Sequence, residues 1–317
     1  MEKKRRGTMS NVAIVGGSGF IGDALTKKLM LESKYKITIL DIKPPKLNVE
    51  YLNTDITDID QLKKNLKNMD IVINLAAIVG VDYCHNNPEI VESINFNSVK
   101  KIIEACKVNN IQKFIFSSSS EVYGDLVQQP LDEDCEKKPL SVYAHSKLKA
   151  EEYIKNYNAD MDFIILRFFN AYGENQRNDF VVNNFIDKAL ENKPIEIHGD
   201  GEQIRCFTYI SDIVEGIFKA INCQNQREVD FNIGNNTPIS IKELANYIIK
   251  ITGSKSNIQY VNYGENNVRK EDIKLRIPNI NKAKDILNFK PSVSWQEGVK
   301  KIVEYKRHVL SFEPPKK

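Results

Sequence analysis

The feature that most constrains the fold is a glycine-rich turn between an apolar run and a helical pattern. Residues 12–22 read VAIVGGSGFIG. Gly16 permits a tight turn, Gly19 lets the backbone approach a bound phosphate, and Gly22 lets a helix pack closely on the preceding strand. The first N–H groups of that helix can face an anion. The spacing is GxxGxxG rather than GxGxxG, so the pattern needs support from its surroundings, and the alternative is a purely structural turn.

The surroundings supply that support, because apolar runs alternate with helical patterns through the first half of the chain. The alternation predicts a parallel sheet covered by helices on both faces, which is an α/β fold of the Rossmann-like, doubly wound kind. The expected strands are residues 11–15, 36–40, 70–75, 113–117 and 162–167. The expected helices are residues 20–31, 60–68, 89–108 and 142–157.

After Arg167 the pattern changes, because Gly, Asn and Asp become frequent and irregular loops join the helical stretches 184–191, 240–252 and 295–305. We therefore expect a nucleotide-binding Rossmann domain over residues 9–170, with a returning strand near 207–233. We expect a smaller mixed substrate domain over residues 171–317. Residues 1–8 contain a basic cluster without apolar periodicity, and we expect a disordered tail or a remnant of expression there.

Composition excludes several classes of protein. The 317 residues carry a net charge of only +3, which gives no general basic bias toward nucleic acid. Five cysteines without a CxxC pair, and four scattered histidines, predict neither a disulfide scaffold nor a metal site, and they fit a reducing compartment. Neither a membrane-spanning apolar run nor a signal-peptide pattern is evident. We expect a cytoplasmic protein without membrane or nucleic-acid partners.

An acid at the end of the second apolar run points to a dinucleotide. Asp41 can accept both adenosine ribose hydroxyls and would repel a 2′-phosphate, so it favours NAD over NADP. Lys43, two residues on, leaves some room for NADP. Asp55 and Ile56 are candidates to border the adenine, but Asp55 fits a helix cap or turn equally well.

The segment YAHSK places Tyr143 and Lys147 on one face of a helix. A free tyrosine has a pKa of about 10, and bringing it to about 7 requires roughly 4 kcal/mol. An ammonium at about 4 Å supplies roughly that much at an effective dielectric constant of about 20. The tyrosine could then act as a base toward a sugar hydroxyl, oriented by the serine run at residues 117–120. Without the serines and the glycine turn, an ordinary surface pair would be the better interpretation.

Taken together, the motifs carry a family resemblance. GGSGFIG, NLAA (residues 74–77), SSSSEVYG (117–124), YAHSK (143–147) and LRFFNAYG (166–173) occur in this order, followed by HGDGEQIRCFTYISD (198–212). The chain from residue 9 onward resembles the extended short-chain dehydrogenase/reductase family, which contains nucleotide-sugar epimerases and dehydratases. Val142 and Cys206 depart from the family pattern, and Cys206 bears on how Arg205 is held.

The resemblance implies roles at matching positions. Catalytic roles fall to Ser119, Tyr143, Lys147 and Glu121. The cofactor is NAD, with expected contacts from Gly16, Gly19, Phe20, Ile21, Gly22, Asp41, Asp55, Ile56, Leu75, Ala76, Ala77, Asn95, Ser117, Tyr143, Lys147 and Phe169. The substrate is a nucleotide-diphosphate sugar, with expected contacts from Ser119, Ser120, Glu121, Asn170, Asn184, Arg205 and Arg276. Each arginine could instead form a surface ion pair, which is the common role of an isolated arginine.

Reactions of this family share the oxidation of sugar carbon 4 to a ketone and differ in the fate of that ketone. We expect a 4-epimerase, since that needs only the residues already identified. The alternatives are a 4-dehydrogenase, a UDP-glucuronate decarboxylase or a 4,6-dehydratase in which Glu121 is a base. Glu121 could equally orient the sugar or a loop. A non-catalytic NAD-binding protein is the remaining alternative. By family analogy, residues 89–108 and 142–157 would form a homodimer interface.

Overall fold

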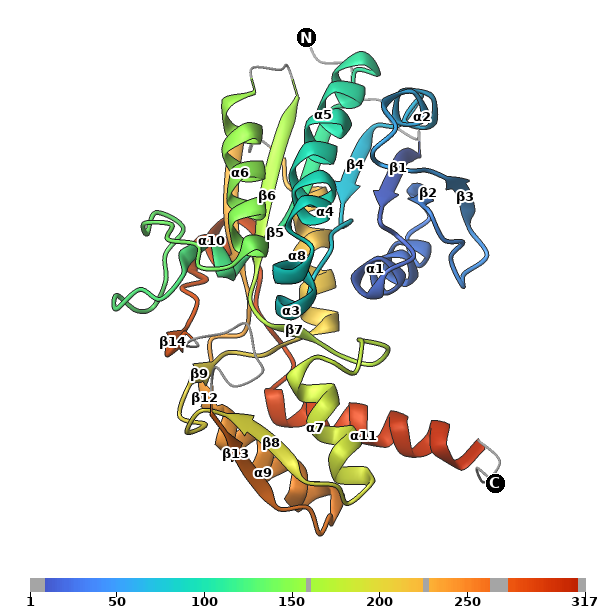
Figure 1. The fold of residues 1–317 in the computed structure, drawn as a ribbon. Coiled ribbons are helices and arrows are strands. Elements are labelled where there is room, and N and C mark those ends of the chain that lie inside the picture. Colours follow the sequence, from blue (N-terminus) through green and yellow to red (C-terminus); the bar gives the residue numbers. More distant parts are fainter. Residues whose placement is uncertain (1–8, 158–160, 225–227, 263–272, 313–317) are drawn as a thin grey trace. The chain divides into compact units, whose positions relative to one another are not determined.

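The computed structural model describes residues 9–157, 161–224, 228–262 and 273–312. The expected tail at residues 1–8 lies outside these ranges. The chain divides into two compact units (Figure 1). The first unit comprises Met1–Val122, Pro139–Arg167 and Val214–Phe231, and the second comprises Tyr123–Lys138, Phe168–Ile213 and Asn232–Lys317.

The first unit is built on a seven-stranded sheet within the described residues. Its strands are β1 (Ser10–Val15), β2 (Tyr35–Asp41), β3 (Glu50–Asn53), β4 (Ile71–Asn74), β5 (Lys113–Ser119), β6 (Asp162–Phe168) and β11 (Glu228–Ile233). Their order is β11-β6-β5-β4-β1-β2-β3, and β1 pairs in parallel with both β2 and β4. The chain thus proceeds outward in one direction from β1 and in the other from β4. The Rossmann-like, doubly wound α/β fold expected from the sequence is confirmed.

Helices join these strands. They are α1 (Phe20–Met30), α2 (Ile59–Asn65), α3 (Val81–Asn86), α4 (Pro88–Glu92), α5 (Ser98–Val108), α6 (Val142–Asn156) and α8 (Ile210–Asn222), with a π-turn η1 (Ser93–Asn97) and a 3-10 turn η2 (Ser120–Tyr123). In the first unit α5 and α6 run beside each other along β5 and β6 (Figure 1). No helix among the described residues combines the length and apolar character needed to cross a membrane.

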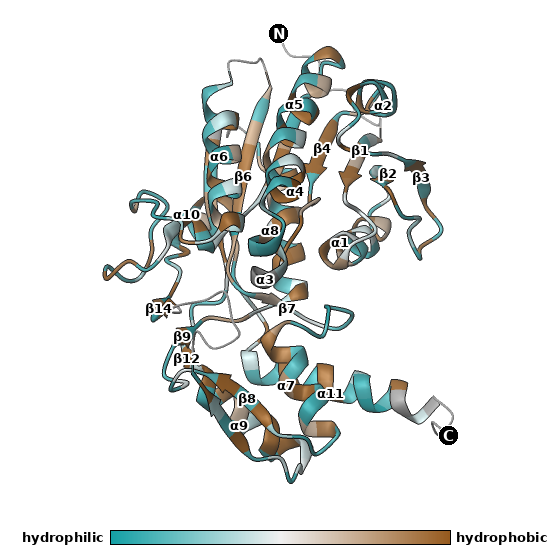
Figure 2. Ribbon diagram, in the orientation of Figure 1, coloured by the Kyte–Doolittle hydropathy of each residue, from teal (hydrophilic) through white to brown (hydrophobic). Residues whose placement is uncertain are grey.

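Burial of the strand residues explains why the sheet needs cover on both faces. Val15, Phe114 and Phe116 belong to one buried cluster that includes Val99 and Ile103 of α5. β1 and β4 are therefore seen as apolar bands in the hydropathy colouring (Figure 2). Since both faces of such a strand are buried, its sequence is continuously apolar rather than alternating.

The helix expected at residues 89–108 is interrupted by η1 at its middle. Asn95 lies in this π-turn and is buried. Its side chain accepts a hydrogen bond from the N–H of Ile78 at 2.8 Å and donates to the Ile78 carbonyl at 2.9 Å. The extra residue of a π-turn rotates Asn95 toward the loop that follows β4. The inserted residue shifts the helical repeat by one position at η1, and the prediction of one continuous helix over residues 89–108 did not include that shift.

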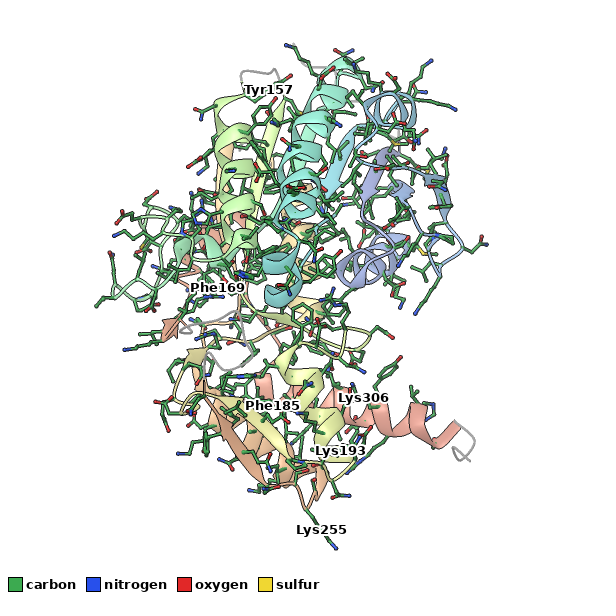
Figure 3. All side chains as sticks on the ribbon, viewed as in Figure 1. Tyr157, Phe169, Phe185, Lys193, Lys255 and Lys306 are labelled. Atoms are coloured by element: carbon green, nitrogen blue, oxygen red, sulfur yellow. The ribbon has the colours of Figure 1, made fainter. Side chains whose placement is uncertain are left out.

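The second unit contains short strands and several helices. Its strands are β7 (Ala171–Tyr172), β8 (Ile195–His198), β9 (Ile204–Arg205), β10 (Thr208–Tyr209), β12 (Ile239–Ser240), β13 (Ile258–Val261) and β14 (Leu275–Arg276). Its helices are α7 (Val181–Leu190), α9 (Ile241–Thr252), α10 (Asn281–Leu287) and α11 (Trp295–Phe312). Helix α11 lies against α7, where Lys306 donates to Asp187 near the labelled Phe185 (Figure 3).

Candidate active site

The glycine turn joins β1 to α1 with close backbone contacts. Gly16 has φ of +76°, and a Cβ there would stand 2.6 Å from the backbone N of Ala76. A Cβ on Gly22 would stand 2.5 Å from the backbone of Gly17. Gly19 precedes α1 and provides no side-chain cap, so the first N–H groups of α1 stay available for an anion. The turn therefore has the form that a dinucleotide pyrophosphate requires.

Asp41 ends β2 beside this turn. Its carboxylate accepts hydrogen bonds from the N–H of Ser18 at 3.1 Å and from the N–H of Lys43 at 3.0 Å. These bonds fix the carboxylate next to the glycine turn, and a carboxylate retains further acceptor sites for ribose hydroxyls. Asp55 is different, because it accepts from both the N–H and the hydroxyl of Thr57. The geometry of Asp55 is that of a turn residue, with Ile56 buried beside it.

The loop after β4 meets the glycine turn from the other side. The N–H of Leu75 donates to the Val15 carbonyl at 2.8 Å, and the N–H of Ala76 donates to Oδ1 of Asn74 at 3.1 Å. Nδ2 of Asn74 is buried and has no hydrogen-bond partner within the described residues. A buried donor of this kind at the switch point between β1 and β4 fits a site completed by a bound polar group. Residues 16, 19, 41 and 75–77 are thus brought together, as a dinucleotide site requires.

Lys147 is buried between α6 and β5. Its Nζ donates to the backbone carbonyl of Ser117 at 2.8 Å. It lies 4.8 Å from the ring centroid of Phe116 and 6.0 Å from that of Tyr143. Burial lowers the pKa of Lys147 to about 7, against a smaller opposing influence of the Glu151 carboxylate. Lys147 therefore sits beside the Tyr143 ring, but its charge depends on its surroundings.

The serines at the end of β5 have different hydrogen-bond partners. Ser117 Oγ donates to the Asn74 carbonyl at 2.9 Å, which ties β5 to β4. Ser119 Oγ accepts from the N–H of Glu121 at 3.2 Å. Ser119 and Ser120 are both buried in the protein. Ser119 is thus linked through Glu121 to Ser141 at the start of α6, and it belongs to the same unit as Tyr143 and Lys147.

Glu121 contacts the first turn of α6. Its carboxylate accepts from Ser141 Oγ at 3.1 Å, and Ser141 in turn caps α6 by accepting from the N–H of Ala144 at 3.0 Å. The acid is therefore part of the structure that begins the helix carrying Tyr143. A carboxylate near a helix N-terminus is also favoured by the helix dipole.

One functional candidate escaped the sequence reasoning. Glu151 follows Lys147 by one helical turn, is buried, and pairs with Arg167 of β6. Its position in the segment KLKAEE resembles an ordinary solvated charge run. The available signal was the four-residue spacing from Lys147 together with an arginine that ends an apolar strand.

In the second unit the two candidate arginines lie side by side. Arg205 of β9 and Arg276 of β14 are register partners in a parallel pair, and they are 6 % and 4 % exposed. Two adjacent guanidinium groups on one small sheet suit a diphosphate. Neither has the exposure of a surface ion pair, which was the alternative interpretation.

The remaining candidates of the second unit are distributed over loops and α7. Phe169, labelled in Figure 3, is fully buried with its ring 6.2 Å from that of Tyr123. Asn170 has φ of +38° and donates to the Cys206 carbonyl at 2.9 Å. Asn184 lies on α7 and donates to the Asn178 carbonyl at 3.3 Å. Asn170 is therefore held by the backbone carbonyl of residue 206, and this contact does not depend on the cysteine side chain.

Comparisons with known proteins agree with this geometry. Residues 12–234 match the model of the NAD dependent epimerase/dehydratase family. A putative UDP-glucose 4-epimerase of Methanocaldococcus jannaschii is 34% identical over 94% of this chain and 98% of its own length. A UDP-N-acetyl-alpha-D-glucosaminuronate decarboxylase of Bacillus cytotoxicus is 32% identical over 93% of this chain and 97% of its own.

A solved structure is also similar. The UDP-glucuronic acid 4-epimerase from Bacillus cereus, in complex with UDP-glucuronic acid and NAD, superposes with a TM-score of 0.87. It is 31% identical, and the match covers 94% of this chain and 99% of that one.

Proposed function

We propose that this chain, which belongs to the NAD dependent epimerase/dehydratase family, inverts carbon 4 of a UDP-sugar through a 4-keto sugar. The observation that carries the proposal is the buried Lys147, which lies beside the Tyr143 ring and donates to the Ser117 carbonyl two residues before Ser119. The glycine turn, Asp41 and the loop at residues 75–77 would hold NAD. When bound, NAD supplies a reversible hydride acceptor.

The residues of α6 and β5 would handle the proton. Tyr143, as a phenolate, removes the proton from the carbon-4 hydroxyl and later returns it to the carbonyl oxygen. Lys147, as an ammonium, stabilises the phenolate, because the two charges are opposite and solvent is largely excluded from the lysine. Ser119, through its hydroxyl, orients the sugar oxygen. Each residue acts twice, so no net proton is consumed.

The arginines of the second unit would hold the substrate phosphates. Arg205 and Arg276 together offer two guanidinium groups to a diphosphate that carries two negative charges. Asn170 and Asn184 are proposed as further contacts to the nucleotide sugar. The uridine nucleotide is inferred from the names of the relatives.

Glu121 separates this function from its alternatives. In a decarboxylase or dehydratase branch, an acid here would act on the sugar after oxidation. The hydrogen bond from Ser141 instead directs the Glu121 carboxylate toward the start of α6. This contact favours an orienting role and therefore the epimerase, although the decarboxylase among the relatives keeps the second candidate in view.

The test is a product assay. Purified protein with NAD is incubated with UDP-, GDP-, CDP- and dTDP-sugars, and products are identified by mass and NMR. We expect a UDP-sugar to yield a product of unchanged mass with inverted carbon 4. Loss of carbon dioxide or of water would assign a decarboxylase or a dehydratase, and no turnover of any substrate would refute the proposed function.

A matched substitution identifies the role of Glu121. Glu121→Gln should retain epimerisation within about threefold, because Ser141 can still donate to the amide oxygen. Loss of turnover with unchanged substrate binding would instead make Glu121 a catalytic base. Ser141→Ala is a separate variant, because it keeps the acid but removes both the hydrogen bond to Glu121 and the cap of α6.

The other assignments that we propose concern organisation. The first unit would bind NAD and the second the sugar nucleotide. Phe96 of η1, Tyr153 of α6 and Tyr157 at the end of α6 form an aromatic group that would support a homodimer through the segments 89–108 and 142–157. The protein would function in the cytoplasm, and sedimentation would test its oligomeric state.

A further inference from the structure

Helix α6 carries a second buried ionisable residue beyond Lys147. Tyr143, Lys147 and Glu151 occupy successive turns of one helix face, because each follows the previous one by four residues. Glu151 and Lys147 are each 1 % exposed. A carboxylate and an amine at this depth are both costly unless they are paired or hydrogen-bonded.

Glu151 is held by two residues of neighbouring strands. Arg167 on β6 donates through Nε to Oε1 at 3.0 Å and through Nη2 to Oε2 at 2.6 Å. Ser118 Oγ on β5 also donates to Oε1. Because Ser117 accepts from Lys147, two successive residues of β5 fasten two successive turns of α6. Ser119 follows directly, so the same attachment fixes its place relative to Tyr143.

The buried carboxylates near Lys147 also have cationic partners on other residues. Arg167 Nη2 also contacts Asp230 Oδ2 at 2.7 Å. Asp230 Oδ2 also forms an ion pair with Lys155 Nζ at 2.8 Å, and the Lys155 side chain is 43% exposed. Asp230 therefore has a cation of its own in Lys155, and Arg167 is shared between Asp230 and Glu151. A Lys147 ammonium, one helical turn from Glu151, is a second positive charge near that carboxylate.

Arg167 of β6 pairs with Glu151, and the other described elements packed against α6 present neutral groups or outward-facing charges to Lys147. From β5 it meets the Ser117 carbonyl and the Phe116 ring, and from its own helix the Tyr143 phenol. The π-turn presents the neutral amide of Asn95, which bonds Ser146. Glu92 of α4 is paired with Lys149, and His85 of α3 and Glu104 of α5 are exposed. Glu121 bonds Ser141.

We propose that Glu151 is a positioning residue that keeps Lys147 protonated and oriented beside Tyr143. Its catalytic consequence rests on the proposed function, but its electrostatic coupling to Lys147 does not. Burial lowers the pKa of Lys147 to about 7, and Glu151 opposes that effect. Without Glu151 the amine would lose its proton at lower pH, and a neutral amine does not stabilise a phenolate.

The first test needs no substrate. Unfolding by urea is compared for the wild type and Glu151→Gln at pH 6, 7.5 and 9. Below pH 7 the wild type gains the attraction between Lys147 and Glu151, and above it Lys147 is neutral in both proteins. The stability gap between them should therefore narrow as pH rises. In a Lys147→Met background the gap should be independent of pH.

The second test measures kinetics. Glu151→Gln should lower kcat at pH 7 at least tenfold, with KM for the sugar nucleotide changed less than twofold. Asp230→Asn is the matched control, because it makes the same chemical change at the other carboxylate that contacts Arg167. It should lower stability equally at all three pH values and keep kcat within about twofold.

A further variant covers the case in which Glu151→Gln does not fold. Glu151→Met with Arg167→Met removes the pair together, and replacement of a buried ion pair by apolar residues is often tolerated. The same narrowing and the same loss of kcat are expected. A pH-independent gap, or an unchanged kcat, would overturn the proposal. If the wild type turned over no nucleotide sugar, the proposed function would fail, while the unfolding test would still decide the coupling.

Discussion

Nζ of Lys147 donates a hydrogen bond to the backbone carbonyl of Ser117 at 2.8 Å. This bond fastens the middle of α6 to the end of β5, two residues before Ser119. It can form whether the amine is charged or neutral, so it fixes position without fixing protonation. The charge of Lys147 is therefore set by burial and by nearby carboxylates, and this makes its titration measurable.

We expect Lys147→Met to change the pH dependence of stability. The pKa of Lys147 falls from the ordinary 10.5 to about 7 in the folded protein. Between these values the unfolded chain binds one more proton than the native protein, so wild-type stability rises with pH there, by at most about 1.4 kcal/mol per pH unit. The variant lacks this contribution. Urea unfolding of both proteins at pH 6 to 10 measures it, and parallel curves would contradict the titration.

We expect Tyr143→Phe to abolish turnover while sparing the fold. Tyr143 lies in the first turn of α6 and is only partly buried, so loss of its hydroxyl leaves packing intact. Its kcat should fall by at least about a thousandfold, because the proton acceptor is gone. The thermal midpoint and the Kd for NAD should stay near wild-type values. Tyr157→Phe, at the end of the same helix, is the control. Near-native turnover of Tyr143→Phe would refute the assignment.

We expect Asp41→Ala to weaken NAD binding at least tenfold and to reduce the preference for NAD over NADP. Asp41 accepts from Ser18 and Lys43, and its remaining acceptor sites suit ribose hydroxyls. Calorimetric titration with both dinucleotides gives the ratio. Asp55→Ala is the comparison, because Asp55 serves a local turn with Thr57 and should leave that ratio unchanged. An unaltered ratio in Asp41→Ala would place ribose selection elsewhere.

The strands of the first unit could be predicted because they are apolar on both faces. β3 was missed, because Glu50–Asn53 is a short edge strand whose residues are at most partly buried. The helix predicted over residues 142–157 agrees with α6 to within one residue, and the structure shows that Ser141 caps it and that Ala150 and Ile154 are buried. Local pattern was sufficient wherever burial was continuous along an element.

The sequence could also place Tyr143 and Lys147 on one helix face, but it could not reveal how deeply Lys147 is buried. That depth arises from β5 and α6 packing together, which is a contact between segments far apart in the chain. The pairing of Glu151 with Arg167 has the same origin. Contacts between distant segments determine whether a buried side chain is charged. Sequence spacing can therefore identify the residues of the site, but it cannot give their protonation states.

We expect Arg276→Gln to raise KM for the sugar nucleotide at least tenfold with little change in kcat. Arg276 lies beside Arg205 on adjacent strands, and both are buried, so a bound diphosphate would meet two guanidinium groups at once. Removing one donor weakens charge-assisted bonds to the phosphates but leaves the proton relay on α6 unchanged. A fall in kcat with KM unchanged would instead show that Arg276 takes part in the reaction step.

Arg307→Gln on α11 is the control, since Arg307 is exposed and donates to the Thr252 carbonyl. Inhibition by UDP supplies the decisive measurement: its inhibition constant should rise in parallel with KM in Arg276→Gln, and an unchanged constant would show that Arg276 does not hold the diphosphate.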